Sequence, residues 1–356
     1  MADELRQKLF GIASNGALSL TIALGVKLGI FDALAETGTN ENPATSEQVA
    51  AKAGLKTRYV KEWLCAIACG GLIEVDESGE KFWISEETKG VLSGPNKEGP
   101  VLFHLMMPIL GSIYGDISKV FEKNGPLGMN YSAYGEFYEI MNQMSHALHK
   151  QHLVPSLIPM IGMKEKLEKG IQVLDVGCGK GFHIFELASH FPNSHFTGVD
   201  LTPSAIEGAE KDRIQNGAKN VEFICQDAKN LDSAWKDKFD LVFIFDACHD
   251  QTRPDLCMKE IHRVLKPDGL FAMIEVDSSG NCYVEKTTKG PLASMFYANS
   301  LFHCLPVGAS TEDALALGSM WGVERGQNLL KESGFSEVKV EKTLFFPFNV
   351  LYTAKK

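Results

Sequence analysis

Four stretches of the sequence that are typical of buried strands each carry an aspartate at or just after the carboxyl end. The aspartates and their predicted strands are Asp175 in 171–176, Asp200 in 194–200, Asp227 after 220–225 and Asp246 in 239–246. Ligands of open α/β sheets bind at the carboxyl ends of the strands, so these side chains are expected to face one ligand. Asp200 is suited to accept hydrogen bonds from two ribose hydroxyls, and Asp227 from an adenine amino group.

The first of these strands runs directly into a glycine-rich turn. Asp175 is followed by Gly177, Gly179 and Gly181, which gives the spacing D-x-G-x-G-x-G. A dinucleotide fingerprint requires G-x-G-x-x-G, and a P-loop requires a Lys-Ser/Thr pair after the turn, so neither matches. A carboxylate beside the turn would repel a pyrophosphate. The turn therefore predicts a nucleoside ligand with a cationic end, received at a helix start over 182–190.

The elements that must position these residues alternate between strand and helix. The sequence predicts further helices over 203–216, 254–265 and 326–333, and a fifth strand over 269–276. This alternation is typical of a parallel α/β sheet. Two last strands, 336–345 and 348–354, have no helix between them and must pair antiparallel. Residues 280–322 have mixed character.

The first 95 residues predict a separate unit. Leu5, Leu9 and Ile12 recur with helical spacing, and a second helix is expected over 17–28. Two short helices and a hairpin over 72–84 complete a winged-helix pattern. The unit holds nine basic and thirteen acidic residues, which disfavours nucleic-acid binding. We therefore expect a packing module that mediates homodimerisation.

Residues 96–168 are expected to form a helical connector and lid, with Pro95 and Gly99-Pro100 marking the break. Its aromatic stretch contains Tyr131, Tyr134 and Phe137. These rings suit either an ordinary core or a lid over a small-molecule pocket. The three histidines spaced three apart lack a carboxylate or Cys partner and are expected to lie on a solvated helix face: His146, His149 and His152.

Composition narrows the setting. The chain has 356 residues, a formal net charge of −10 and eight scattered cysteines. An acidic chain is a poor partner for nucleic acid or an anionic membrane. No basic leader precedes an apolar segment at the start, and the apolar run over 17–34 is interrupted by Lys27 and Asp32 and is expected to be too short to span a bilayer. A reducing, cytoplasmic location is the simplest interpretation.

Taken together, the glycine turn and the strand-end acids resemble the motifs of class I S-adenosylmethionine (SAM) methyltransferases. The stretch 262–270 and the closing strand pair also resemble that family's pattern. The resemblance implies a Rossmann-like, seven-stranded methyltransferase domain over 169–356, behind an N-terminal winged-helix-like domain over 1–95. It implies SAM as the cofactor, held by Asp175, Gly177, Cys178, Gly179, Gly181, Asp200, Leu201, Asp227, Ala228 and Asp246.

The whole chain further resembles the plant-type O-methyltransferases, which act on small molecules. In that family a His-Asp pair follows the fourth strand, and here His249-Asp250 stands there. The resemblance implies that His249 is the general base that takes the acceptor's proton. Its carboxylate partner is left open among Glu275, Asp277 and Glu324. No metal is expected.

Three alternatives stay open from the sequence. A thiol acceptor ionises more readily than an alcohol and would need less help, so a small-thiol S-methyltransferase competes with an O-methyltransferase. A SAM-sensing winged-helix regulator without catalysis is opposed by the acidic first unit. A nicotinamide oxidoreductase is opposed by Phe182 in the turn.

Overall fold

The computed structural model describes residues 1–94, 97 and 99–356, which form two compact units, Met1–Ser112 and Ile113–Lys356. Each unit is described by itself below. Residue 95, where the sequence places the end of the first domain, lies outside the described residues. The predicted three-part division at 95 and 168 stays a prediction.

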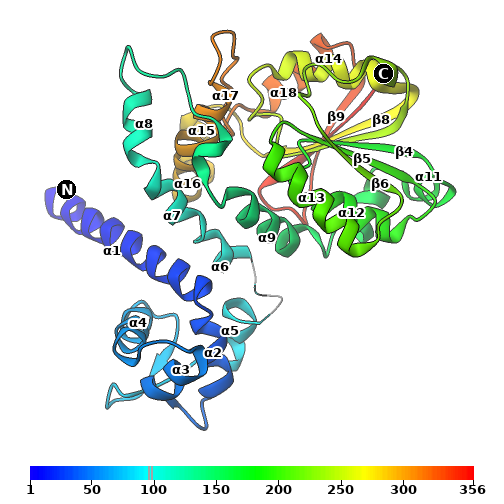
Figure 1. The fold of residues 1–356 in the computed structure, drawn as a ribbon. Helices are drawn as coiled ribbons and strands as arrows, with labels where there is room; N and C mark the ends of the chain where they lie inside the picture. Colours follow the sequence, from blue (N-terminus) through cyan, green and yellow to red (C-terminus); the bar gives the residue numbers. More distant parts are fainter. Residues whose placement is uncertain (95–96, 98) are drawn as a thin grey trace. The chain divides into compact units, whose positions relative to one another are not determined.

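The first unit is a small helical domain with a three-stranded sheet (Figure 1). Its elements are α1 (Ala2–Lys27), α2 (Ile30–Thr37), β1 (Ala44–Thr45), α3 (Ser46–Ala53), α4 (Thr57–Cys69), β2 (Glu74–Val75), β3 (Lys81–Trp83), α5 (Glu86–Leu92), α6 (Gly99–Phe103) and α7 (Met106–Ser112). The sheet has the order β1-β3-β2 and is antiparallel. A capping box between Thr45 and Gln48 starts α3. The predicted helix–turn–helix–hairpin pattern is confirmed.

Helix α1 differs from the prediction. The sequence predicted two helices separated near residue 16, whereas one helix of 26 residues runs through Gly11 and Gly16. This helix is long and apolar enough to cross a bilayer by length and composition, although only 17% of its apolar window is buried. The candidate segment thus differs from the apolar run over 17–34, because the helix begins at Ala2 and ends at Lys27.

The second unit begins with short helices and ends in an α/β domain. The leading elements are α8 (Tyr114–Val120), η1 (Tyr131–Tyr134), α9 (Phe137–His149), η2 (Leu153–Leu157), α10 (Ile158–Met160) and α11 (Lys164–Lys169). The α/β elements are β4 (Gln172–Val176), α12 (Phe182–His190), β5 (His195–Asp200), α13 (Pro203–Asn216), β6 (Val221–Cys225), η3 (Ser233–Trp235), β7 (Phe239–Phe245), α14 (Pro254–Val264), β8 (Leu265–Val276), α15 (Cys282–Thr288), α16 (Pro291–Asn299), η4 (Ser300–Cys304), α17 (Leu305–Gly308), α18 (Val323–Glu332), β9 (Ser336–Lys342) and β10 (Asn349–Lys355).

Seven strands form one sheet in the order β6-β5-β4-β7-β8-β10-β9. The first five strands are parallel, and β10 pairs antiparallel with both β8 and β9. The Rossmann-like sheet with a reversed final strand is confirmed. The order in which successive strands are added reverses at β4: β5 and β6 lie on one side of it, and β7 and β8 lie on the other. Ligands of such sheets bind at the carboxyl ends of the strands next to this reversal.

Both faces of the sheet are covered, which explains the continuous apolar strands. Along β4, Leu174 and Val176 pack into a core with helices α14 and α18. Val173 points the other way, into a core with α12 and α13. Because strand side chains alternate, Asp175 lies on the same face as Val173, where burial leaves a charge little access to water.

Gly198 on β5 offers a test of this packing. A Cβ there would lie 2.6 Å from Ile184 and 2.8 Å from Phe223. We expect Gly198→Ala to lower the free energy of unfolding by about 1–3 kcal/mol, measured by urea denaturation, because the core must shift to admit the methyl group. Gly115→Ala, where nothing lies within 4 Å, is the matched control in helix α8 and should leave the free energy of unfolding unchanged or raise it by up to about 1 kcal/mol. Equal stability of the two variants would contradict this packing.

Candidate functional site

The glycine turn needs glycine for two physical reasons. Gly177, Gly179 and Gly181 have φ values of 74°, 54° and 80°, a region that side chains disfavour. A Cβ at Gly177 would also lie 2.6 Å from Ala247, and one at Gly181 would lie 2.4 Å from Phe223. Only Gly179 is open, with nothing but the Tyr138 ring near it, at 3.6 Å. Gly179 is therefore the glycine of this turn with the most room for a ligand near its backbone.

Asp175 lies buried beneath this turn without a partner. It is 3% exposed, and both carboxylate oxygens lack any hydrogen bond. Burial, with the Asp200 charge nearby, raises the pKa of Asp175 well above its usual range. An unpaired buried carboxylate is costly and marks a site where a ligand completes the set of contacts. Its sign calls for a cationic ligand.

Asp200 ties the turn to the next strand end. Its Oδ2 accepts from the Gly179 N–H at 2.9 Å, and its Oδ1 accepts from the Thr202 N–H at 2.9 Å. The Tyr138 hydroxyl also reaches Oδ1, at 3.4 Å. Burial raises the pKa of Asp200, although the backbone N–H groups act against this. Asp175, Gly179 and Asp200 are thus brought together.

The remaining residues predicted to hold the nucleoside differ in their exposure and in their contacts. Asp227 accepts from the Lys229 N–H at 3.1 Å and forms a 3.1 Å ion pair with its ammonium, so its carboxylate is held within its own turn. Cys178 and Ala228 are buried, whereas Leu201 is 60% exposed. These contacts leave the predicted adenine role of Asp227 as a prediction.

Asp246 follows β7 in a left-handed conformation, with φ of 47°. Aspartate tolerates that region better than most residues. Its Oδ1 accepts from the Asn349 side chain at 2.7 Å. Burial and the nearby Glu275 raise the pKa of Asp246 to about 7. Asp246 thus lies in the chain between the predicted nucleoside-binding acids and His249, and the charge of Glu275 acts on it.

His249 is buried between two carboxylates. Its Nδ1 lies 2.7 Å from Glu275, which also accepts from the His249 backbone N–H at 3.2 Å. Its Nε2 lies 3.4 Å from Asp250. Burial alone would lower the pKa of His249, but the Glu275 and Asp250 charges outweigh it and raise the pKa well above the usual range.

Glu275 is therefore the partner that the sequence left open. The contact of Glu275 with His249 Nδ1 fixes the imidazole ring and leaves His249 Nε2 as the atom that can exchange a proton. The other two candidates lie elsewhere: Asp277 is 3.6 Å from Lys342, and Glu324 is exposed on α18.

The aromatic residues predicted as a lid gather around a histidine that the sequence did not single out. Tyr131 donates to Asp250 Oδ2 at 2.6 Å, and Tyr134 donates to the Phe302 carbonyl at 2.9 Å. Phe137 stacks on His303 with ring centroids 3.9 Å apart. His303 Nε2 and Asp250 Oδ1 are buried and have no hydrogen-bond partner. These groups mark a second place that a ligand can complete.

One cluster in the described part of the chain could reach a common metal ion. Side-chain ligand atoms of His249, Asp250 and Cys304 lie within 4.8 Å of one another.

One expectation about the connector is wrong. His149 is not on a solvated face but is 7% exposed, and its Nδ1 lies 2.8 Å from His183 Nε2. Burial lowers the pKa of His149 to about 4 and that of His183 well below its usual range, so the pair is neutral at pH 7. The hydrogen bond joins the end of α9 to helix α12.

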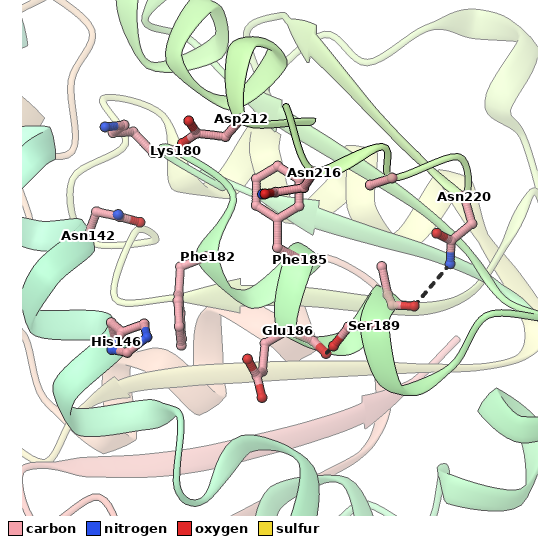
Figure 2. Close-up of a pocket in the computed structure, with 12 residues that line it drawn as sticks. Asn142, His146, Lys180, Phe182, Phe185, Glu186, Ser189, Asp212, Asn216 and Asn220 are labelled. Atoms are coloured by element: carbon pink, nitrogen blue, oxygen red, sulfur yellow. Dashed lines mark hydrogen bonds between the residues drawn. The ribbon is translucent and has the colours of Figure 1, made fainter. Parts of the chain in front are cut away.

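A separate hollow of about 440 Å³ opens among α9, α12, α13 and the segment before β6. Figure 2 shows Phe182, Phe185 and three asparagines lining it. None of the residues predicted to bind a ligand lines it, although Lys180 of the glycine turn does. We do not place the site there.

Two known families match the chain. Residues 167–334 match the family described as "Methyltransferase domain", and residues 16–93 match an Rv2258c-like winged helix-turn-helix domain. Human N-acetylserotonin methyltransferase in complex with SAM has the same fold, with a TM-score of 0.68, 18% identity, and 99% and 97% of the two chains covered.

Curated relatives match the second half of the chain. A ubiquinone/menaquinone biosynthesis C-methyltransferase of Roseobacter denitrificans is 29% identical over 170 residues, which is 46% of this chain and 64% of that protein. A fatty-acid O-methyltransferase of Mycolicibacterium smegmatis is 30% identical over 151 residues, which is 42% and 48% of the two. The chain thus spans about half to two thirds of these relatives' lengths.

The isolation of Asp175 predicts a stability that depends on pH. Its folded pKa is raised, so the unfolded chain releases this proton first and the folded state loses stability as pH rises above about 4. We expect Asp175→Asn to be more stable than the natural chain by about 1 kcal/mol at pH 7.5 in urea denaturation, with the gain vanishing near pH 4. The exposed Asp268→Asn is the control. A loss of stability in Asp175→Asn at pH 7.5 would show that the carboxylate has a partner.

Proposed function

We propose that this chain is a SAM-dependent methyltransferase that acts on an oxygen or sulfur atom of a small molecule. Residues 167–334 match a methyltransferase domain, which follows a winged helix-turn-helix domain. The observation that carries the proposal is the buried Asp175, which has no hydrogen-bond partner, beside the half-buried glycine turn. SAM has both a cationic end and a nucleoside. The cationic end would supply the contacts that Asp175 lacks, and the ribose would offer hydroxyl donors to Asp200.

The residues present fit the cofactor. Asp175 and the glycine turn would hold the methionine part, and Asp200 the ribose hydroxyls. Asp227, Ala228 and Leu201 would border the adenine, and Asp246 would lie beside the reacting end. When bound, SAM supplies a methyl group on a sulfonium, which is already a good leaving group. The chain's own contribution is to position the acceptor and to manage its proton.

His249 is the residue we propose to take that proton. Glu275 holds Nδ1, so Nε2 faces the acceptor side, where Asp250, Tyr131 and His303 gather. The two carboxylates stabilise the imidazolium that forms, which makes His249 a strong base when it is neutral. This arrangement favours a hydroxyl acceptor, although a small thiol would be served by the same atoms.

The regulator alternative is disfavoured by the contacts of α4. Arg58 forms an ion pair with Glu62, and Lys61 lies 2.6 Å from Glu80. The basic side chains of the helix that would read DNA are therefore paired with carboxylates of the same unit. A groove-reading helix needs free positive charge, so we propose that the winged domain does not bind nucleic acid.

We also propose a cytoplasmic homodimer. All eight cysteines are free thiols, which suits a reducing compartment. Along α1, Leu5, Leu9, Phe10 and Ile12 are 57–79% exposed. Apolar surface of this kind is typical of a protein interface, and a second copy of the chain is the partner that we infer.

Two substitutions separate binding from chemistry. We expect Asp200→Ala to abolish SAM binding in calorimetry, because the ribose loses its acceptor. We expect His249→Ala to keep SAM binding and to lower kcat by about 10²–10⁴-fold for an acceptor found in a labelled-SAM screen. Normal turnover in His249→Ala would remove the base assignment but not the cofactor site.

The raised pKa of His249 predicts the pH profile. A base must be neutral, so kcat/KM for an alcohol acceptor should rise about tenfold per pH unit through neutral pH and level off above the raised pKa. Glu275→Gln removes one carboxylate, lowers that pKa and should move the plateau to lower pH. A flat profile between pH 6 and 9 would contradict the role of His249.

A further inference from the structure

The carboxylate of Asp200, which we assign to the ribose, is already occupied by a side chain from a distant part of the sequence. The Tyr138 hydroxyl lies 3.4 Å from Asp200 Oδ1 and 2.7 Å from Thr202 Oγ1. With the N–H groups of Gly179 and Thr202, both oxygens have partners. A hydroxyl on this carboxylate is the same chemical group that a ribose would offer.

The Tyr138 ring covers the open position of the glycine turn. A Cβ built on Gly179 would meet the Tyr138 ring atoms Cδ1 at 3.6 Å and Cε1 at 3.8 Å. Nothing else lies within 4 Å of that point. The ring therefore takes van der Waals contact at the one place where the turn would touch a ligand, and the hydroxyl takes the polar contact.

Helix α9 holds Tyr138 there from both ends. In its first turn, Glu139 pairs with Lys180 of the glycine turn at 2.5 Å. At its last residue, His149 is hydrogen-bonded to His183 on α12. Gly135, just before the helix, has φ of 53°, which glycine adopts at little cost because it has no side chain. The first turn is thus held by the exposed Glu139–Lys180 ion pair and by the buried stack of Phe137 on His303, next to a glycine.

We infer that Tyr138 occupies the ribose position in the free protein, and that the cofactor binds only as its nucleoside displaces the phenol from Asp200 and from the glycine turn. The inference rests on the proposed function, because it takes Asp200 as the ribose acceptor. Binding exchanges one hydroxyl for another on the same carboxylate, so the net affinity is lower than the bound contacts alone would give. The fraction of molecules with Tyr138 displaced limits the apparent affinity.

Tyr138→Phe tests this directly. The substitution keeps the ring and removes the hydroxyl that holds Asp200 in the free state. We expect SAM to bind about threefold to tenfold more tightly in calorimetry, as losing one hydrogen bond from the free state alone implies. In stopped-flow binding, the gain should appear in the association rate with the dissociation rate unchanged. Tyr114→Phe, a 66% exposed tyrosine of the same unit, is the matched control.

The outcomes separate the two proposals. If the natural chain does not bind SAM, the proposed function fails. If it binds SAM and Tyr138→Phe binds with equal or lower affinity, the displacement fails and the function stands. Faster dissociation from Tyr138→Phe would show that the hydroxyl contacts the bound cofactor instead. Thermal unfolding of the variant within a few degrees of the natural chain confirms that the comparison concerns folded protein.

Discussion

The burial of Asp175 and Asp200 at the carboxyl ends of the neighbouring strands β4 and β5 is the constraint on which the site depends. A parallel strand covered on both faces leaves polar groups only at its ends, so the sheet gathers charge at one edge. Asp200 finds backbone N–H partners there, and Asp175 finds none. The fold therefore keeps a carboxylate without a hydrogen-bond partner next to a glycine turn that only the Tyr138 ring covers at Gly179.

Around His249 the buried charges have opposite signs and stabilise one another, in contrast to the unpartnered Asp175. His249 is buried, yet two carboxylates keep its charged form favourable. Glu275 comes from β8 and orients the ring, while Asp250 is itself held by Tyr131 from η1. The histidine is thus fixed by elements on either side of it in the sequence. Its position depends on the sheet order β4-β7-β8 rather than on any local motif.

The sequence predicted those features that local pattern determines. The seven strands, the reversed final pair and the strand-end acids follow from apolar runs that end in polar residues. The glycine turn follows from spacing, and all three of its glycines have the conformation that side chains disfavour. The winged domain was predicted from its capping residues and its hairpin.

What the sequence could not supply depends on contacts between distant residues. The continuity of α1 was missed because Gly11 and Gly16 resemble a break, although neither has a neighbour within 4 Å to strain the helix. His149 was assigned to solvent because helical spacing gives no sign of a partner on α12. Tyr138 and Asp200 are 62 positions apart, and His303 lies on η4 in a segment of mixed character.

Helix α9 links two halves of the site, because two neighbouring residues in its first turn contact different groups. Tyr138 contacts Asp200, whereas Phe137 stacks on His303 beside Asp250. Tyr138 and Phe137 are adjacent residues in the first turn of α9, so a shift of this turn would move both side chains. Displacement of Tyr138 by such a shift would couple the two halves of the site, and that coupling would change the dissociation constants of the two ligands reciprocally.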